Sequence, residues 1–238
     1  MQFPSPLVEG RLVRRYKRFL ADVALPDGTE ITAHCANPGA MLGLNQPGAR
    51  VLLSVSDNPA RKLGHSWELV EADLPGGPQW VGINTARPNH LVAEAFRAGL
   101  LAPLAGYDGL RPEVRYGRAS RVDFLATGPG LPPAHVEVKN CHLMRTPGLA
   151  EFPDCVAARS ARHMRDLADV VAAGGRALVI VVVQMRAEAF DVARDLDPAF
   201  DRAFREARAM GVETHAYRCA VGPEGVRVAE PIPVVTPP

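Results

Sequence analysis

Residues 121–140 read RVDFLATGPGLPPAHVEVKN, and this stretch decides the fold expected for the second half of the chain. Its two ends alternate apolar with polar residues, and the segment between them is rich in glycine and proline. Alternation with a period of two is typical of a half-buried β-strand, whereas glycine and proline are typical of a turn. The stretch therefore predicts an antiparallel hairpin whose strands cover residues 120–126 and 135–143.

The same alternation gathers charged side chains on one face of the hairpin. Asp123 lies on one face of its strand, and Glu137 and Lys139 share one face of the next. Since Mg²⁺ takes one or two carboxylates together with water and phosphate, we predict a site for Mg²⁺ or Mn²⁺ held by Asp123, Glu137 and the Val138 carbonyl. The metal would polarise a phosphodiester and activate a water that Lys139 orients. A solvated strand edge is the alternative interpretation of this spacing. Asn140 faces the other side of an ideal strand and is left out of the set.

The elements around this hairpin indicate a sheet covered by helices. From residue 88 onward we predict the order helix, strand, strand, strand, helix, strand, helix, strand. The first helix follows Pro88, and the later ones cover residues 160–173 and 199–210. Residues 177–183 are apolar throughout, which is typical of a strand covered on both faces, and residues 212–219 are expected as an edge strand. The predicted class is α/β (α+β overall), with a central mixed sheet flanked by helices.

The first third of the chain has a different pattern. Short β segments are expected at residues 12–24, 30–35, 49–56 and 65–73, separated by turn signals, and this spacing favours a small closed β-barrel. Trp67 is expected in the barrel core. A boundary is predicted near residues 76–82, where the cluster Pro75-Gly76-Gly77-Pro78 would break a regular element. The expected domains are residues 1–82 and 83–238.

Composition narrows the class of protein. The chain has 238 residues and no apolar run long enough to span a bilayer or act as a secretory signal, so a soluble cytoplasmic protein is expected. Its four cysteines have no zinc-like spacing, which favours free thiols. The formal net charge of +1 does not by itself indicate a nucleic-acid binder, so the distribution of charge matters more.

Basic residues concentrate near the N-terminus and at two later points. An aromatic residue interleaved with cations favours DNA contact, because bases stack on the ring while cations meet phosphates, although a solvated face is the alternative. Arg159, Arg162 and His163 share one helix face, which could meet phosphate or water. The predicted DNA-binding residues are Arg14, Arg15, Tyr16, Lys17, Arg18, Arg61, Lys62, Arg159 and His163.

Asp123 followed by Glu137-Val138-Lys139, after a helix that carries Glu94, resembles the PD-(D/E)xK nuclease signature. In that superfamily the helix before the first strand often supplies an acid, which maps onto Glu94. A glutamine on a later core strand can also face the site, which maps onto Gln184. Glu113 is a further candidate acid, with pairing to a neighbouring arginine as its alternative role. The expected catalytic set is Asp123, Glu137, Lys139, Glu94, Glu113 and Gln184.

A longer resemblance covers nearly the whole chain. The motifs that carry it include RRYKRFLAD at residues 14–22, NPARKL at 58–63, VGINT at 81–85 and FPD at 152–154. These motifs resemble the sugar fermentation stimulation protein A family. The resemblance implies an OB-like N-terminal barrel, a nuclease-like C-terminal domain, DNA binding and a regulatory link to sugar metabolism. The chain departs from the family pattern at Asn37-Pro38-Gly39-Ala40, where Asn-Thr-Gly-Ser is more usual.

Two functional hypotheses follow. One is a Mg²⁺- or Mn²⁺-dependent endodeoxyribonuclease, favoured by the complete set of acids and lysine. The other is a non-catalytic, DNA-binding transcriptional regulator of sugar metabolism that keeps the site as a binding surface. An enzyme acting on small sugars has no support, since the sequence contains neither a phosphate loop nor a dinucleotide fingerprint.

Overall fold

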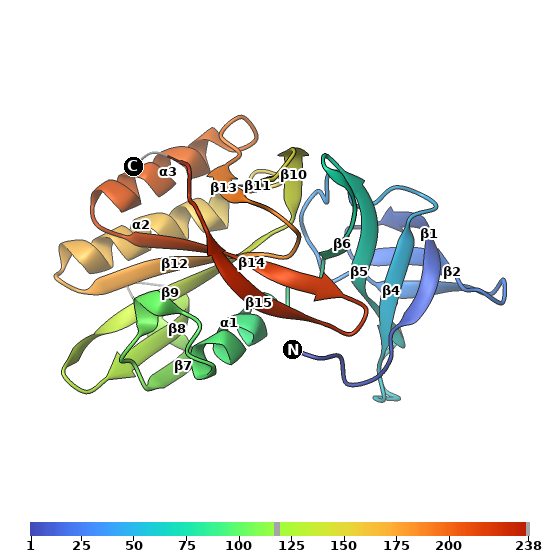
Figure 1. The fold of residues 1–238 in the computed structure, drawn as a ribbon, viewed down its shortest axis with the longest axis horizontal. Coiled ribbons are helices and arrows are strands. Elements are labelled where there is room, and N and C mark those ends of the chain that lie inside the picture. Colours follow the sequence, from blue (N-terminus) through green and yellow to red (C-terminus); the bar gives the residue numbers. More distant parts are fainter. Residues whose placement is uncertain (117–119, 237–238) are drawn as a thin grey trace.

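The computed structural model describes residues 1–116 and 120–236, and it begins with a β-barrel (Figure 1). β1 pairs antiparallel with β2 and with β4, and β5 pairs with β4 and β6. A parallel bridge from His34 to Ser66 joins β3 to β5 and closes the ring. This is the predicted OB-like barrel. Its strands are β1 (Val8–Tyr16), β2 (Leu20–Ala24), β3 (Glu30–His34), β4 (Arg50–Val55), β5 (His65–Leu74) and β6 (Gly77–Gly82).

The barrel differs from the sequence-based expectation at two turns. The segment expected as one strand at residues 12–24 is a hairpin, which turns at Lys17 and Arg18 with φ of 47° and 64°. The Pro75–Pro78 cluster is the tight turn between β5 and β6 rather than a break between domains, because Gly76 and Gly77 supply the positive φ that the turn needs. β6 ends before the predicted boundary at residue 82/83 and α1 begins after it. Trp67 is fully buried in the barrel, as predicted.

The second part of the chain forms a six-stranded mixed sheet in the order β15-β14-β12-β9-β8-β7. β9, β12 and β14 run parallel to one another, and the other pairs are antiparallel. A second sheet of three short strands has the order β10-β11-β13. The elements are α1 (Pro88–Arg97), η1 (Ala102–Leu104), β7 (Gly109–Tyr116), β8 (Ser120–Gly128), β9 (Leu131–Cys141), β10 (Leu143–Thr146), β11 (Leu149–Phe152), α2 (Ala158–Ala172), β12 (Arg176–Val183), β13 (Ala189–Val192), α3 (Pro198–Ala209), β14 (Glu213–Gly222) and β15 (Gly225–Ile232).

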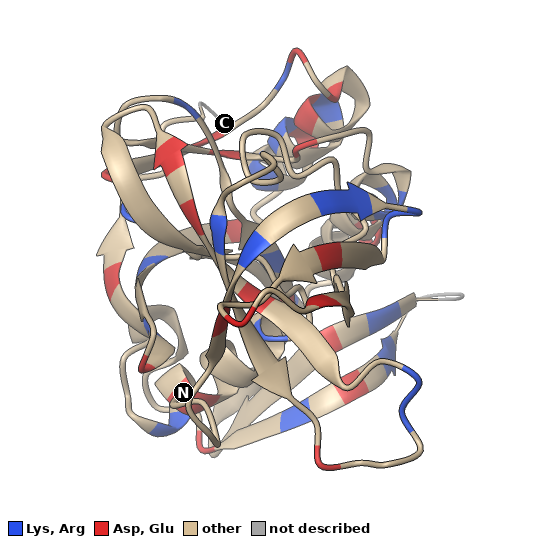
Figure 2. Ribbon diagram, turned by 90° about the vertical axis from the view of Figure 1, so that its right-hand side faces the viewer, with Lys and Arg blue, Asp and Glu red and all other residues tan. Residues whose placement is uncertain are grey.

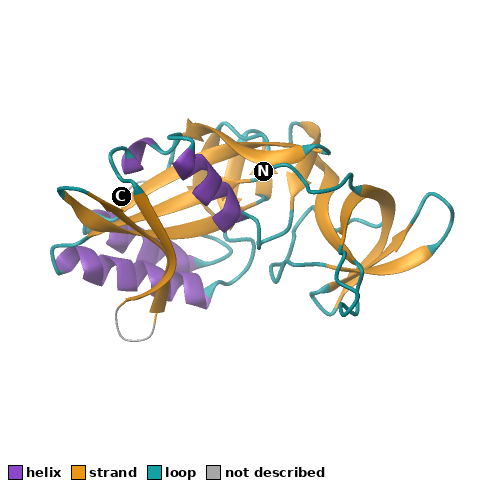
Figure 3. Ribbon diagram, turned by 90° about the horizontal axis from the view of Figure 1, so that it is seen from below, coloured by secondary structure: helices purple, strands orange, loops and turns teal. Residues whose placement is uncertain are grey.

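Helices cover both faces of the six-stranded sheet (Figure 3). On β12, Leu178, Ile180 and Val182 pack in the same apolar cluster as residues of α1. The alternate residues Val179 and Val181 pack in a second cluster with α2 and α3. Because successive side chains of a strand point to opposite faces, the all-apolar run is buried on both sides. The predicted α+β class, with a barrel followed by a helix-flanked mixed sheet, is confirmed.

One expectation about the end of the chain is wrong. The strand expected at the edge, residues 212–219, is β14, which lies between β12 and β15. β15 forms the edge instead, because the turn between Gly222 and Gly225 returns the chain antiparallel to β14. No helix in the described part of the chain is long and apolar enough to cross a membrane.

Candidate metal and phosphodiester site

Three of the predicted catalytic residues, Asp123, Glu137 and Lys139, line one pocket of about 500 Å³. Asp123 comes from β8, and Glu137 and Lys139 come from the neighbouring strand β9, as the alternation of the hairpin indicated. Val138 also lines this pocket. Glu137 and Lys139 are 2% and 7% exposed, so the charged groups lie at the pocket floor rather than on a solvated edge.

Glu137 is held from two sides through one oxygen. Lys139 Nζ donates to Glu137 Oε1 over 2.5 Å, and His163 Nδ1 from α2 contacts the same oxygen. Arg159 Nε donates to His163 Nε2 over 3.3 Å. Since Nε2 accepts, the proton of a neutral His163 sits on Nδ1 and is donated to Glu137. His163, one of the residues predicted to contact DNA, lines the pocket with its ring buried against Glu137.

Asp123 is oriented by two donors. Asn89 Nδ2, at the start of α1, donates to Asp123 Oδ1 over 2.9 Å, and the Val138 backbone N–H donates to Oδ2 over 2.8 Å. Sequence reasoning missed Asn89, which lies in the first turn of α1, because nothing in the sequence indicated that it contacts Asp123. The two donors fix the carboxylate beside Glu137.

The floor is electrostatically suited to a cation. Burial, and then repulsion from Glu137, raise the pKa of Asp123. Burial raises the pKa of Glu137, but Lys139 and His163 outweigh it and hold this pKa below its ordinary value. Two carboxylates that repel one another in a buried pocket are the usual surroundings of a divalent metal.

One atom of this floor is left without a partner. Glu137 Oε2 is buried and accepts no hydrogen bond from any residue that the structure describes. A buried carboxylate oxygen without a donor is costly, and a metal ion would satisfy it. No three His, Cys, Asp or Glu side chains of residues 1–116 and 120–236 gather closely enough to hold a metal by themselves. The donor set therefore fits an ion such as Mg²⁺, which is bound through one or two carboxylates and completes its shell with water and phosphate.

The walls of the pocket come from both parts of the chain. Arg18, Asn37, Pro38, Gly39 and Thr85 form the barrel side. Residues 151–160, from the end of β11 to the first turn of α2, form the side contributed by the second part of the chain. Of the predicted DNA-binding residues, Arg18, Arg159 and His163 line this pocket, and Arg18 and Arg159 are exposed.

A polar network that sequence reasoning missed connects the two walls. Asp154 Oδ2 accepts the Met41 N–H over 2.7 Å and lies 3.4 Å from His142 Nε2. Burial raises the pKa of Asp154, but the hydrogen bond and charge of His142 and the Met41 N–H lower it to about 2. Asn140 Nδ2 in turn lies 3.0 Å from His142 Nδ1. Asp154 belongs to a motif quoted from the sequence, but nothing there indicated its partner.

Gln184 reaches the pocket only through Asn140. Its Nε2 donates to Asn140 Oδ1 over 2.7 Å, and it lies outside the pocket lining, whereas Asn140 is part of that lining. The expectation that Gln184 faces the site is therefore corrected, as is the omission of Asn140. Gln184 is held away from the pocket by its backbone, because it follows the last residue of β12 and its N–H donates to the Cys141 carbonyl.

Two predicted acids are not brought to the pocket. Glu94 is exposed and pairs with the Met1 amino group, because α1 buries Leu91 and Ala95 and turns Glu94 outward. Glu113 is exposed with φ of 53° and lines a different hollow, beside α1. Its left-handed backbone interrupts the alternation of β7 and directs the side chain away from the floor. The catalytic assignments of Glu94 and Glu113 are thus not supported.

The basic segment of β1 is largely engaged within the barrel. Arg15 donates to the carbonyls of Asn37 and Gly39 over 2.8 and 2.9 Å. Arg14 Nε and the Tyr16 hydroxyl donate to the two oxygens of Asp22 over 2.8 and 3.1 Å. Arg15 therefore stabilises the loop at residues 37–40, and Arg14 and Tyr16 are hydrogen-bonded to Asp22. Lys17, Arg61 and Lys62 are exposed in barrel loops.

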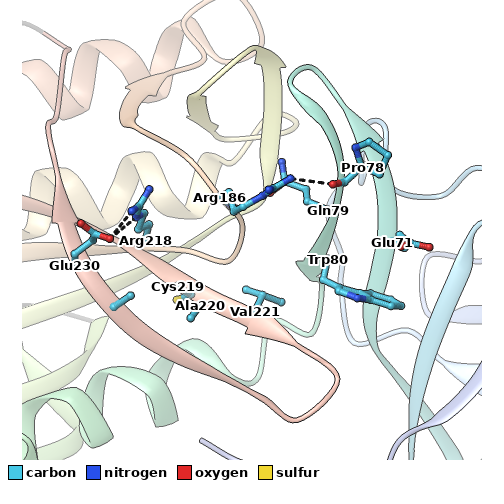
Figure 4. A pocket seen from close by; sticks show the side chains of 11 residues that line it. Glu71, Pro78, Gln79, Trp80, Arg186, Arg218, Cys219, Ala220, Val221 and Glu230 are labelled. Atoms are coloured by element: carbon cyan, nitrogen blue, oxygen red, sulfur yellow. Dashed lines mark hydrogen bonds and ion pairs between the residues drawn. The ribbon is translucent and has the colours of Figure 1, made fainter.

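A second hollow, of about 560 Å³, lies between β6 and the β14–β15 hairpin (Figure 4). It contains Trp80 and two arginines, but Arg186 Nη2 donates to the Pro78 carbonyl and Arg218 Nε donates to Glu230. Arg186 is thus hydrogen-bonded to the backbone, and the charge of Arg218 is neutralised by Glu230. This hollow carries neither the acid pair nor the lysine.

Comparison with known proteins identifies the family. A model described as the sugar fermentation stimulation protein RE domain matches residues 86–225, and the SfsA N-terminal OB domain matches residues 13–83. A sugar fermentation stimulation protein homolog from Methylorubrum populi is 79% identical, covering 100% of this chain and 96% of its own length. Another from Jannaschia sp. is 53% identical, covering 98% and 97%.

A solved structure has the same fold. SfsA of Pyrococcus furiosus, in complex with Ca²⁺, superimposes with a TM-score of 0.87 at 24% identity, covering 98% of this chain and 97% of its own. The identity is too low to transfer more than the fold. The matches to both domain models and the high identity of the relatives together show that this chain belongs to the sugar fermentation stimulation protein (SfsA) family.

Proposed function

We propose that this protein hydrolyses phosphodiester bonds of DNA with the help of a divalent metal. The observation that carries the proposal is the unpartnered, buried Glu137 Oε2 in a pocket that also contains Asp123 and Lys139. An acid pair alone could be structural. An acid pair with one oxygen left free, next to a fixed ammonium group, supports a site built for a cation and a phosphate.

The residues have distinct roles in this proposal. Asp123, Glu137 and the Val138 carbonyl would hold Mg²⁺ or Mn²⁺, which when bound polarises the phosphodiester and lowers the pKa of a water. Asn89 keeps Asp123 oriented. Lys139, at 2.5 Å from Glu137 Oε1, is positioned to orient the attacking water and to offset charge that develops on the phosphate. That the Pyrococcus furiosus structure contains Ca²⁺ agrees with a divalent cation in this family.

The barrel supports DNA as the substrate. In OB folds the loops between strands 1 and 2 and between strands 4 and 5 bind oligonucleotides. Here the first of these loops carries Lys17 and Arg18, and the second carries Arg61 and Lys62. Figure 2 shows basic and acidic residues interleaved over the barrel side of the molecule. The proposed contact is therefore local to the two loops rather than a broad positive surface.

Cleavage of DNA tests the proposal directly. Purified protein is incubated with linear, circular and single-stranded DNA in Mg²⁺, Mn²⁺ or EDTA. We expect cutting only with metal, and a loss of about 10²- to 10³-fold in Lys139→Ala, the size of effect found when a stabilising group is removed. Asp123→Ala should abolish cutting, whereas Glu94→Gln, an exposed acid outside the pocket, should cut like the wild type. Equal cutting by wild type and Asp123→Ala would refute hydrolysis at this site, and binding without cutting would leave only a DNA-binding role.

A further inference from the structure

The depth of the pocket restricts which form of DNA can reach its floor. Glu137 is 2% exposed, whereas Val156 at the rim is 73% exposed, so the metal-binding groups lie well below the mouth. The pocket volume of about 500 Å³ falls among those that enclose small ligands, and it accommodates about one or two nucleotides. A duplex does not fit into such a space, because each of its phosphates is flanked by stacked, paired neighbours.

The rim carries groups that suit an unpaired strand. Arg18 from the β1–β2 hairpin and Arg159 from α2 both line the pocket, and the Arg18 guanidinium donates to the Pro38 carbonyl over 2.8 Å. Both are exposed, so phosphates of one strand could meet a cation on each side. Val156, which also lines the pocket, exposes its apolar side chain to water. Apolar side chains inserted between bases pack against the faces of the bases that they unstack.

We propose that the pocket takes single-stranded DNA, with Arg18 and Arg159 holding phosphates on either side and Val156 packing against an unpaired base. The proposal rests on the proposed function, and it adds the strand form that the site accepts. In duplex DNA the strand would have to separate locally before its phosphodiester reached Asp123 and Glu137, and this separation costs free energy.

Binding without turnover tests the strand preference. Fluorescence anisotropy in EDTA is measured with a labelled oligothymidylate of about 12 nucleotides, which is within the site size of an OB fold, and with its duplex on oligoadenylate. Wild type should bind the single strand at least about tenfold more tightly. Val156→Ala should reduce this preference severalfold, and Val156→Glu should remove it. Val235→Ala changes another exposed valine, outside the pocket, and should preserve the preference.

The salt dependence tests the two arginines together. For a single strand each phosphate contact contributes about 0.7 to the slope of log affinity against log salt. Arg18→Ala with Arg159→Ala should therefore reduce the slope by about 1.4 for the single strand. Circular dichroism confirms that each variant is folded.

The outcomes separate this inference from the proposed function. Equal binding of single strand and duplex, or an unchanged preference in Val156→Glu, would overturn the inference while leaving metal-dependent cleavage of DNA in place. Absence of metal-dependent cutting of either form would instead remove the proposed function. With Mn²⁺ on a forked substrate, cuts confined to the single-stranded arms would support the inference, and cuts within the paired stem would contradict it.

Discussion

At the residue scale, the pocket floor depends on neighbours that hold the two acids in place. Period-two alternation predicted Asp123, Glu137 and Lys139, because the direction of a side chain on a strand is a local property. Glu94 could not be placed in this way. Whether a helical residue faces the sheet depends on how the helix is rotated, and the burial of Leu91 and Ala95 sets the rotation of α1. The same rotation places Asn89, at the start of the helix, in contact with Asp123.

Asn89 gives a prediction at this scale. Replacing it by alanine removes the donor to Asp123 Oδ1, so the carboxylate is less well oriented for metal. Loss of such a partner typically reduces metal affinity by about 10- to 100-fold, and we expect this for Asn89→Ala in a calorimetric titration with Mn²⁺. His90→Ala, an exposed neighbour on the same helix, serves as the control. Unchanged Mn²⁺ affinity in Asn89→Ala would show that the Val138 N–H alone orients Asp123.

At the element scale, the loop at residues 37–40 is built against the β1–β2 hairpin. The hairpin was expected as one strand because Lys17 and Arg18 are not the glycine or asparagine that usually mark positive φ. The turn is instead stabilised by the loop, since Arg18 Nη2 donates to the Pro38 carbonyl over 2.8 Å. Non-local contacts of this kind leave no periodic signal in the sequence.

Arg15 and Lys17 should therefore respond differently to truncation. Arg15→Ala leaves the carbonyls of Asn37 and Gly39 without their donor, and we expect a loss of about 1–3 kcal/mol in the free energy of unfolding. Its effect on the salt dependence of DNA binding should be small. Lys17→Ala should keep the stability and lower the salt slope by about 0.7–0.9. Urea unfolding and anisotropy titrations measure the two effects, and the reverse result would restore Arg15 as a DNA contact.

At the scale of the whole molecule, the barrel and the mixed sheet were predictable from a change of pattern along the chain, and the family resemblance implied the same two parts. The shared pocket was not predictable. It arises where residues 37–39 of the barrel meet residues 151–160, more than a hundred positions later in the chain. At Gly39 an added Cβ would lie 2.6 Å from both Asp154 oxygens, so this close approach depends on glycine. Neither the periodicity nor the composition of the sequence predicts this contact between residues 37–39 and residues 151–160.

Asp154 makes this junction sensitive to acid. Its pKa is about 2 in the folded protein against an ordinary 3.8, mainly because His142 and the Met41 N–H outweigh its burial. A depressed pKa contributes stability that is complete above the unfolded value and is lost as pH falls from about 4 towards 2. The shift corresponds to about 2 kcal/mol at neutral pH.

The prediction is a pH-dependent difference between wild type and Asp154→Asn. Asparagine can still accept the Met41 N–H but carries no charge, so the variant should be less stable by about 1–2 kcal/mol at pH 6. Because protonation removes the same charge from the wild type, the difference should shrink as pH falls below 4. Urea midpoints measured from pH 6 down to pH 3 give this trend. Asp57→Asn, in the exposed β4–β5 loop, controls for loss of a negative charge. A difference that stays constant over this range would mean that the carboxylate charge does not stabilise the contact between barrel and sheet.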